Sequence, residues 1–98
     1  MDAVTEYLVS EKSLSPANAE KQKAKIAQHP DLNKEFEDWI ARREYEAENS
    51  IEIEGYTAKD IFELAPYLDG IGVFNFMVSL RERPESAKKI IADGFKFK

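Results

Sequence analysis

Helix start and stop signals recur along the whole chain, and they constrain its fold more than any other feature of the sequence. Ser15 precedes Pro16, which is the order of an N-cap followed by the first residue of a helix. Pro30 restarts the helix, and Asp31 stands in its first turn, where a carboxylate is favourable. Gly94 stands where a last helix would end in a left-handed residue. These signals predict several short helices.

The segments between the signals give the expected order of elements. Thr57 and Asp60 have the spacing of a capping box at the start of one of them. The expected helices are a short first helix capped by Asp2, a second from Pro16 to about Gln28, a third from Pro30 to about Glu48, a fourth from the Thr57 cap to about Ala65, a fifth after the Asp69 cap, and a last one from Pro84 to Gly94. We therefore expect an all-α fold, a compact multi-helix domain spanning residues 1–98 with about five to six short helices.

Apolar residues at helical spacing mark the expected core. The third helix has one strongly apolar face, and the fifth helix is apolar on nearly every side, so the fifth should be central. The second helix has a single large apolar residue, Ile26, and should lie at the surface. The residues expected to be buried on the third and fifth helices are Leu32, Phe36, Trp39, Ile40, Phe74, Phe76 and Leu80.

Two short runs alternate apolar and charged residues, and they suggest a small sheet. Residues 51–54 read IEIE and carry only acids, whereas residues 95–98 read FKFK and carry only bases. In paired strands the apolar residues would share one face, and opposite charges would be neighbours on the other. The expectation is a minimal two-stranded β-sheet formed by 51–54 and 95–98. The alternative is an extended connector and a frayed terminus, because a lone two-stranded ribbon is marginal in water.

Composition excludes several kinds of site. The chain has 98 residues, a formal net charge of −5 and no cysteine, which excludes a disulfide, a thiolate metal site and a cysteine nucleophile. The acidic balance argues against non-specific binding to nucleic acid or to an anionic membrane. The N-terminal residues carry acids where a signal peptide would carry bases, and no apolar run is long enough to span a bilayer. We therefore expect a cytoplasmic protein that does not bind membranes.

Two features invite a catalytic or cofactor-binding interpretation without supporting it. His29, the one histidine, has no nucleophile or second ligand at a recognisable spacing, so a turn or cap residue is expected there. Gly70 and Gly72 form a GIG run, but Asn75 stands where the dinucleotide fingerprint needs a third glycine. These glycines more simply allow a helix to start close against its neighbour. We expect no enzymatic activity, no catalytic residue, no cofactor and no metal site.

Charge is unevenly distributed along the chain. Residues 31–54 hold nine acids against three bases, and residues 81–98 hold six bases against three acids. This split could bind a basic partner, drive self-association into a homodimer, or be neutralised within the fold. The candidate interaction surface is formed by carboxylates of the third helix, with an ordinary solvated helix face as the alternative. These residues are Glu37, Asp38, Glu44, Glu46 and Glu48.

A stripe of small and polar residues crosses the apolar fifth helix. Gly72, Asn75 and Ser79 fall on one side of it at helical spacing. Such a stripe suits a small polar pocket or a close helix–helix contact. The favoured interpretation is a tight packing seam in which the polar groups are hydrogen-bonded.

The expected function is a non-enzymatic protein-interaction or regulatory module that acts through surface helices. The alternative is a nucleic-acid-binding regulator that uses the helical hairpin 57–83 and the basic C-terminal end. That hairpin has the outline of a helix-turn-helix, but a recognition helix needs exposed polar and basic residues, and its second helix is apolar. A protein partner is therefore favoured over nucleic acid, and a second copy of the chain is one such partner.

Overall fold

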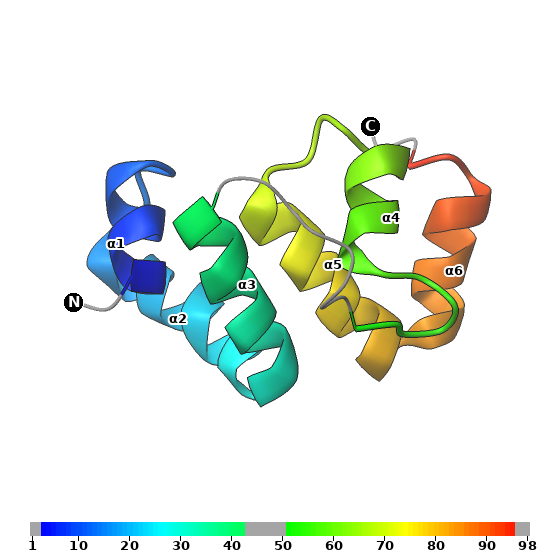
Figure 1. Ribbon diagram of the computed structural model, residues 1–98, viewed down its shortest axis with the longest axis horizontal. Helices are drawn as coiled ribbons and strands as arrows, with labels where there is room; N and C mark the ends of the chain where they lie inside the picture. The colour runs from blue at the N-terminus through cyan, green and yellow to red at the C-terminus, as the bar shows by residue number, and fades with distance from the viewer. Residues whose placement is uncertain (1–2, 43–50, 96–98) are drawn as a thin grey trace.

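Six α-helices make up most of the part of the chain that the computed structural model describes, residues 3–42 and 51–95 (Figure 1). The helices are α1 (Ala3–Ser10), α2 (Pro16–Ala27), α3 (Pro30–Arg42), α4 (Ala58–Leu64), α5 (Gly70–Glu82) and α6 (Pro84–Ala92). The predicted all-α fold is confirmed. The predicted extension of the third helix to Glu48 lies outside the described residues.

The predicted N-caps hold the starts of three helices. The Ser15 hydroxyl accepts the Asn18 N–H at 3.2 Å, and Thr57 and Asp60 form the reciprocal bonds of a capping box, at 3.1 and 2.9 Å. The Asp69 carboxylate accepts the Gly72 N–H at 2.8 Å. Each cap satisfies N–H groups that the helix itself leaves without a partner. The expected cap at Asp2 lies outside the described residues.

α6 ends in the predicted glycine turn. Gly94 has φ +69° and donates its N–H to the Ile91 carbonyl at 2.9 Å, while Phe95 donates to the Ile90 carbonyl at 3.0 Å. These two bonds define a Schellman motif. The turn directs Phe95 back onto Phe76 of α5, with ring centroids 4.9 Å apart, and Phe95 is buried.

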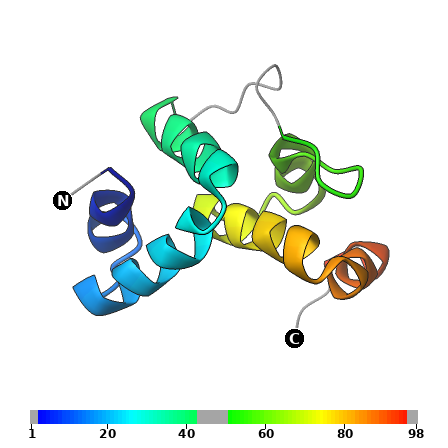
Figure 2. The ribbon, with the colours of Figure 1, turned by 90° about the horizontal axis from the view of Figure 1, so that it is seen from below.

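α5 lies at the centre of the fold. It packs against α2, α3, α4 and α6, and Figure 2 shows it crossing the middle of the molecule, between α1, α2 and α3 on one side and α4 and α6 on the other. Seven of its thirteen residues are buried. Its predicted central position is confirmed, and so is the burial of Phe74, Phe76 and Leu80.

An aromatic cluster joins α1, α3, α4 and α5. The Phe36 ring stacks on Phe74 at 5.0 Å between centroids, and Trp39 packs edge-on to Tyr7 at 5.6 Å and stacks on Phe62 at 5.7 Å. Phe36 and Leu32 are buried as predicted.

The expectation of full burial was wrong for two residues of α3. Trp39 and Ile40 are only partly buried and pack against the edge of the core. They lie near the C-terminal end of α3, beyond the buried residues Leu32, Glu35 and Phe36 of that helix.

The predicted sheet is not formed by the described parts of its two runs. The Ile53 N–H bonds the Tyr56 carbonyl at 2.8 Å, and the Tyr56 N–H bonds the Ile53 carbonyl at 3.0 Å, so Ile53 pairs within its own turn. Glu54 and Gly55 both have positive φ, 54° and 86°, as in a type I′ turn.

The other predicted strand begins at Phe95, whose backbone N–H and carbonyl both form hydrogen bonds outside any sheet. Its φ is +57°, its N–H belongs to the Schellman motif, and its carbonyl accepts the Tyr67 hydroxyl at 2.6 Å. The rest of this run, residues 96–98, lies outside the described residues. Among the helices of residues 3–42 and 51–95, none is long and apolar enough to cross a bilayer.

Candidate interaction surfaces

The acidic candidate surface on α3 is described in part. Glu37 and Asp38 are both exposed, and Glu37 accepts a hydrogen bond from the Asn33 amide at 3.1 Å. Three further members of the predicted surface, Glu44, Glu46 and Glu48, lie outside the described residues. Asp38 also lines a shallow groove of about 470 Å³ whose other lining residues are Asp31, Lys34, Glu35, Arg42 and Ile51. Since this groove mixes acids with bases, it does not favour one sign of ligand charge.

Two acids of residues 31–54 are paired with bases of residues 81–98. Asp31 receives two hydrogen bonds from the Arg81 guanidinium, both at 2.8 Å, and this contact lowers the pKa of the Asp31 carboxyl to about 2. Glu54 is paired with Lys88 of α6 at 2.7 Å, which raises the pKa of the Lys88 ammonium. Part of the charge asymmetry is therefore neutralised within the fold.

His29 links the α2–α3 turn to the end of α5. Its Nε2 lies 2.7 Å from a Glu82 carboxylate oxygen, and this hydrogen bond lowers the pKa of the Glu82 carboxyl. The backbone N–H of His29 donates to the Ile26 carbonyl at 2.9 Å, as in a turn. Within the described ranges, no cluster of three or more His, Asp or Glu residues has the geometry to hold a metal ion.

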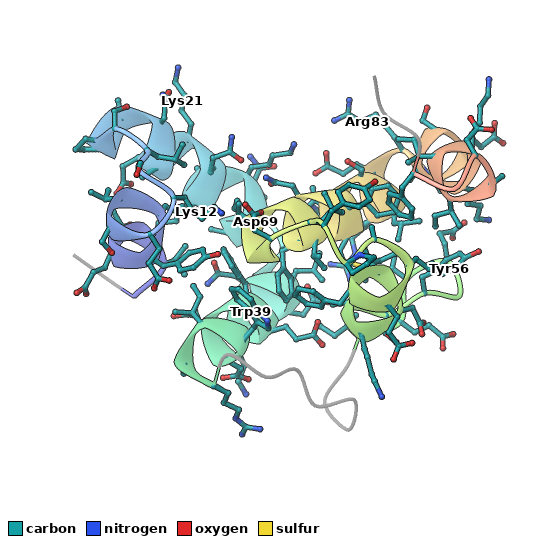
Figure 3. The ribbon with its side chains drawn as sticks, turned by 90° about the horizontal axis from the view of Figure 1, so that it is seen from above. Lys12, Lys21, Trp39, Tyr56, Asp69 and Arg83 are labelled. Carbon is teal, nitrogen blue, oxygen red and sulfur yellow. The ribbon has the colours of Figure 1, made fainter. Side chains whose placement is uncertain are left out.

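A further ion pair ties the end of α1 to the start of α5. The Lys12 ammonium lies 2.5 Å from Asp69, the N-cap of α5, and the two labelled side chains meet above the start of that helix in Figure 3. The carboxylate raises the pKa of the Lys12 ammonium. Asp69 thus has structural roles in both a cap and an ion pair.

The polar stripe on α5 faces neighbouring structure. Asn75 donates from its amide to the Gln22 amide oxygen of α2 at 2.8 Å, and the Ser79 hydroxyl donates to the Asn75 carbonyl at 3.2 Å. Gly72, Asn75 and Ser79 are all partly buried. The Asn75–Gln22 bond joins α5 to α2, as in a packing seam, whereas the Ser79 bond lies within α5. The Asn75 amide oxygen is buried with no hydrogen-bond partner among the described residues, so the polar groups of the stripe are only partly hydrogen-bonded.

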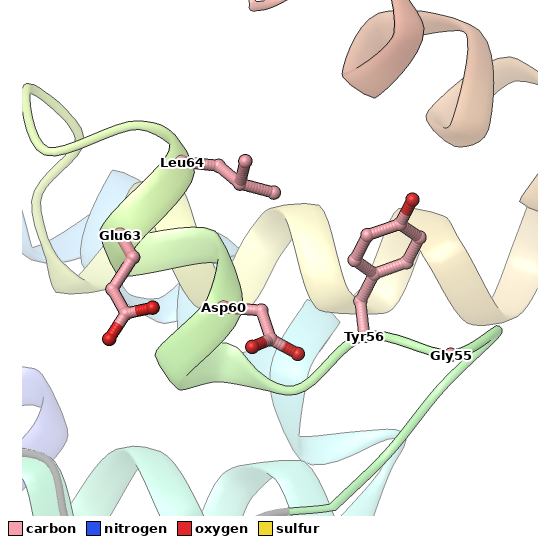
Figure 4. Close-up of a pocket in the computed structure, with 5 residues that line it drawn as sticks. All are labelled: Gly55, Tyr56, Asp60, Glu63 and Leu64. Atoms are coloured by element: carbon pink, nitrogen blue, oxygen red, sulfur yellow. The ribbon is translucent and has the colours of Figure 1, made fainter.

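A second groove lies beside α4, and sequence reasoning missed it. The type I′ turn and the capped first turn of α4 bring together Tyr56, Asp60, Glu63 and Leu64, with Gly55 at one edge (Figure 4). The groove has a volume of about 400 Å³. The Tyr56 ring and the Leu64 side chain project toward its open side, and Leu64 is 49% exposed. The groove therefore combines apolar surface with two carboxylates.

The helical hairpin 57–83 has few features of a DNA-binding helix-turn-helix motif. α5 is enclosed by four helices, and Arg81 at its end is bonded to Asp31. Arg83 and Lys89 are exposed, but Lys88 between them in sequence is paired with Glu54. The basic C-terminal end is thus partly occupied by internal ion pairs.

Comparison with known proteins finds no matching family model, no similar curated protein and no similar solved structure.

Proposed function

We propose that this protein is a non-enzymatic interaction module that binds a basic segment of a protein partner through its surface helices. The observation that carries the proposal is the distribution of carboxylates after folding. Asp31 and Glu54 are used in ion pairs, whereas Glu37, Asp38 and Glu63 remain at the surface of a chain with a net charge of −5. A negative field of this kind steers basic partners and disfavours acidic ones.

The alternative function is nucleic-acid binding through the hairpin 57–83 and the basic C-terminal end. It would use exposed bases such as Arg83 and Lys89 against phosphates. The burial of α5 and the pairing of Arg81 with Asp31 support it less well than they support a protein partner. A homodimer remains within the proposed class of partner, and a cytoplasmic location remains a prediction from the sequence.

A binding assay with charge-matched probes tests the proposal. Fluorescence anisotropy would compare a labelled peptide that alternates Lys with apolar residues, its Glu-for-Lys counterpart, and a labelled DNA duplex. We expect the basic peptide alone to bind. Its affinity should fall as salt is raised from about 0.1 M to about 1 M, because the Debye length shrinks from about 10 Å to about 3 Å. Preferential binding of the acidic peptide or of the duplex would refute the proposal.

A further inference from the structure

We propose that the groove beside α4, lined by Gly55, Tyr56, Asp60, Glu63 and Leu64, is the docking site for a short protein segment in which an apolar side chain is flanked by lysine or arginine. This inference rests on the proposed function, and it assigns that function a place and a partner chemistry. The acidic face of α3 is the competing location.

The apolar part of the groove is not needed by the core. α4 buries Ala58 and Ile61 against the rest of the molecule, whereas Leu64 is 49% exposed. The Tyr56 ring lines the groove beside it. Tyr67, just beyond the end of α4, is also exposed at 61%, but it is not among the described residues that line the groove. Aromatic and aliphatic side chains that surround a small depression are typical anchor points for a partner's side chain.

The charge of the groove selects a basic partner. Among the described residues that line it, Asp60 and Glu63 are acids and none is a base. The ammonium of Lys88 on the neighbouring helix α6 is paired with Glu54 at 2.7 Å. An apolar anchor would therefore occupy the space between Tyr56 and Leu64, and flanking ammonium or guanidinium groups would meet the carboxylates.

The groove is largely preformed. The capping box fixes the first turn of α4, with the Thr57 N–H donating to an Asp60 carboxylate oxygen at 2.9 Å. The two hydrogen bonds between Ile53 and Tyr56 fix the neighbouring turn. A site held in this way needs little ordering when a ligand binds. Its volume of about 400 Å³ lies at the low end of the range for ligand sites, which suits an anchor of one or two side chains.

Anisotropy with matched peptides and variants tests the assignment. The probe is a labelled peptide with one Phe flanked on each side by lysines, and its twin has Ala in place of that Phe. Leu64→Ala should weaken binding of the Phe peptide about tenfold, because a contact with several buried methyl and methylene groups is lost. The peptide with Ala in place of Phe should bind the parent protein and the Leu64→Ala variant weakly and with equal affinity. Glu63→Gln should weaken binding a few-fold and flatten its salt dependence.

A paired variant on α3, Glu37→Gln with Asp38→Asn, tests the competing location. If the segment docks in the groove, this variant should lose less affinity for the Phe peptide than Glu63→Gln does. All the substituted side chains are exposed, so circular dichroism should show unchanged helicity. Loss of binding in the α3 variant with full binding by Leu64→Ala would overturn the groove assignment while leaving the proposed function intact.

Two other results would separate the possible failures. If the parent protein binds neither the Phe peptide nor the alternating basic peptide, the proposed function fails together with the groove. If the parent protein forms a concentration-dependent dimer in solution that Leu64→Ala returns to monomer, the groove holds a second copy, and the basic segment is the wrong occupant.

Discussion

Replacing Gly70 by Ala should destabilise the protein, because the start of α5 approaches the Trp39 indole too closely to admit a side chain. A Cβ atom built at Gly70 would lie 2.2 Å from Trp39 Cζ3, 2.6 Å from Cη2 and 2.7 Å from Cε3. The indole cannot retreat freely, since it packs between Tyr7 and Phe62 with centroid distances of 5.6 and 5.7 Å. Either the indole or the start of α5 must move.

Two opposing effects set the size of the loss. Overpacking a core typically costs about 1–3 kcal/mol, and a clash against an aromatic ring held on two sides belongs in the upper part of that range. Ala also gives the unfolded chain less backbone entropy than Gly does, and this difference stabilises the folded protein by about 0.4–1 kcal/mol. We therefore expect a net loss of about 1–2 kcal/mol, which lowers Tm by about 5–15 °C in a domain of this size.

Gly72→Ala is the matched control, since it changes the same residue type in the same turn of α5. Its Cβ would lie 3.2 Å from an Asp69 carboxylate oxygen and from Leu68 Cδ2, a contact that shifts of a few tenths of an ångström relieve. Urea unfolding followed by circular dichroism should rank Gly70→Ala well below Gly72→Ala in stability. Equal stability of the two variants would contradict the close-packing explanation. Trp39→Phe should recover part of the loss in the Gly70→Ala background, as a favourable coupling in a double-mutant cycle.

Two further predictions concern the charge and cap contacts. Because the folded-state pKa of Asp31 is depressed to about 2, its contact with Arg81 should stabilise the protein above the unfolded pKa near 3.8, and that stability should be lost as pH falls toward 2. The pKa shift alone would give more than 2 kcal/mol, but Asp31 is 45% exposed, so about 1 kcal/mol is expected. Urea unfolding across this pH range should show that the Asp31→Asn variant does not lose this part of its stability as the pH falls. The same pH dependence of stability in the variant and the parent protein would contradict the contribution of this contact. Thr57→Ala should lose about 1 kcal/mol in the same unfolding assay, whereas Thr57→Ser should keep most of the parent stability, and equal losses would refute the cap.

The helix starts were predictable because their causes are local. The Ser15, Thr57 and Asp69 caps each involve residues within three positions along the chain, so spacing alone identifies them. The Schellman turn at Gly94 is equally local. The interpretation of the GIG run as a close helix start also agrees with the contact between Gly70 and Trp39.

The errors concern features that depend on distant parts of the chain. The partial burial of Trp39 depends on where α1 and α4 place Tyr7 and Phe62. The sheet prediction rests on the alternation in residues 51–54 and does not treat Gly55 as a turn signal. Gly55 has a positive φ, and the turn there pairs Ile53 with Tyr56.

Two surface features had no adequate local signal either. The contact between Asp31 and Arg81 spans fifty positions, so charge composition predicted only that neutralisation was possible. The groove beside α4 depends on how a turn, a helix cap and Leu64 meet in space. An apolar residue near the end of a short helix gives no sign of its exposure until the neighbouring helices are placed.

Amide chemical-shift mapping tests the central claim most directly. The protein would be titrated with the Phe peptide flanked by lysines while its backbone amide signals are followed. The docking proposal predicts that the largest shifts fall at Tyr56, Glu63 and Leu64, with little change at Glu37 and Asp38. Largest shifts at Glu37 and Asp38, with the α4 groove unchanged, would contradict it.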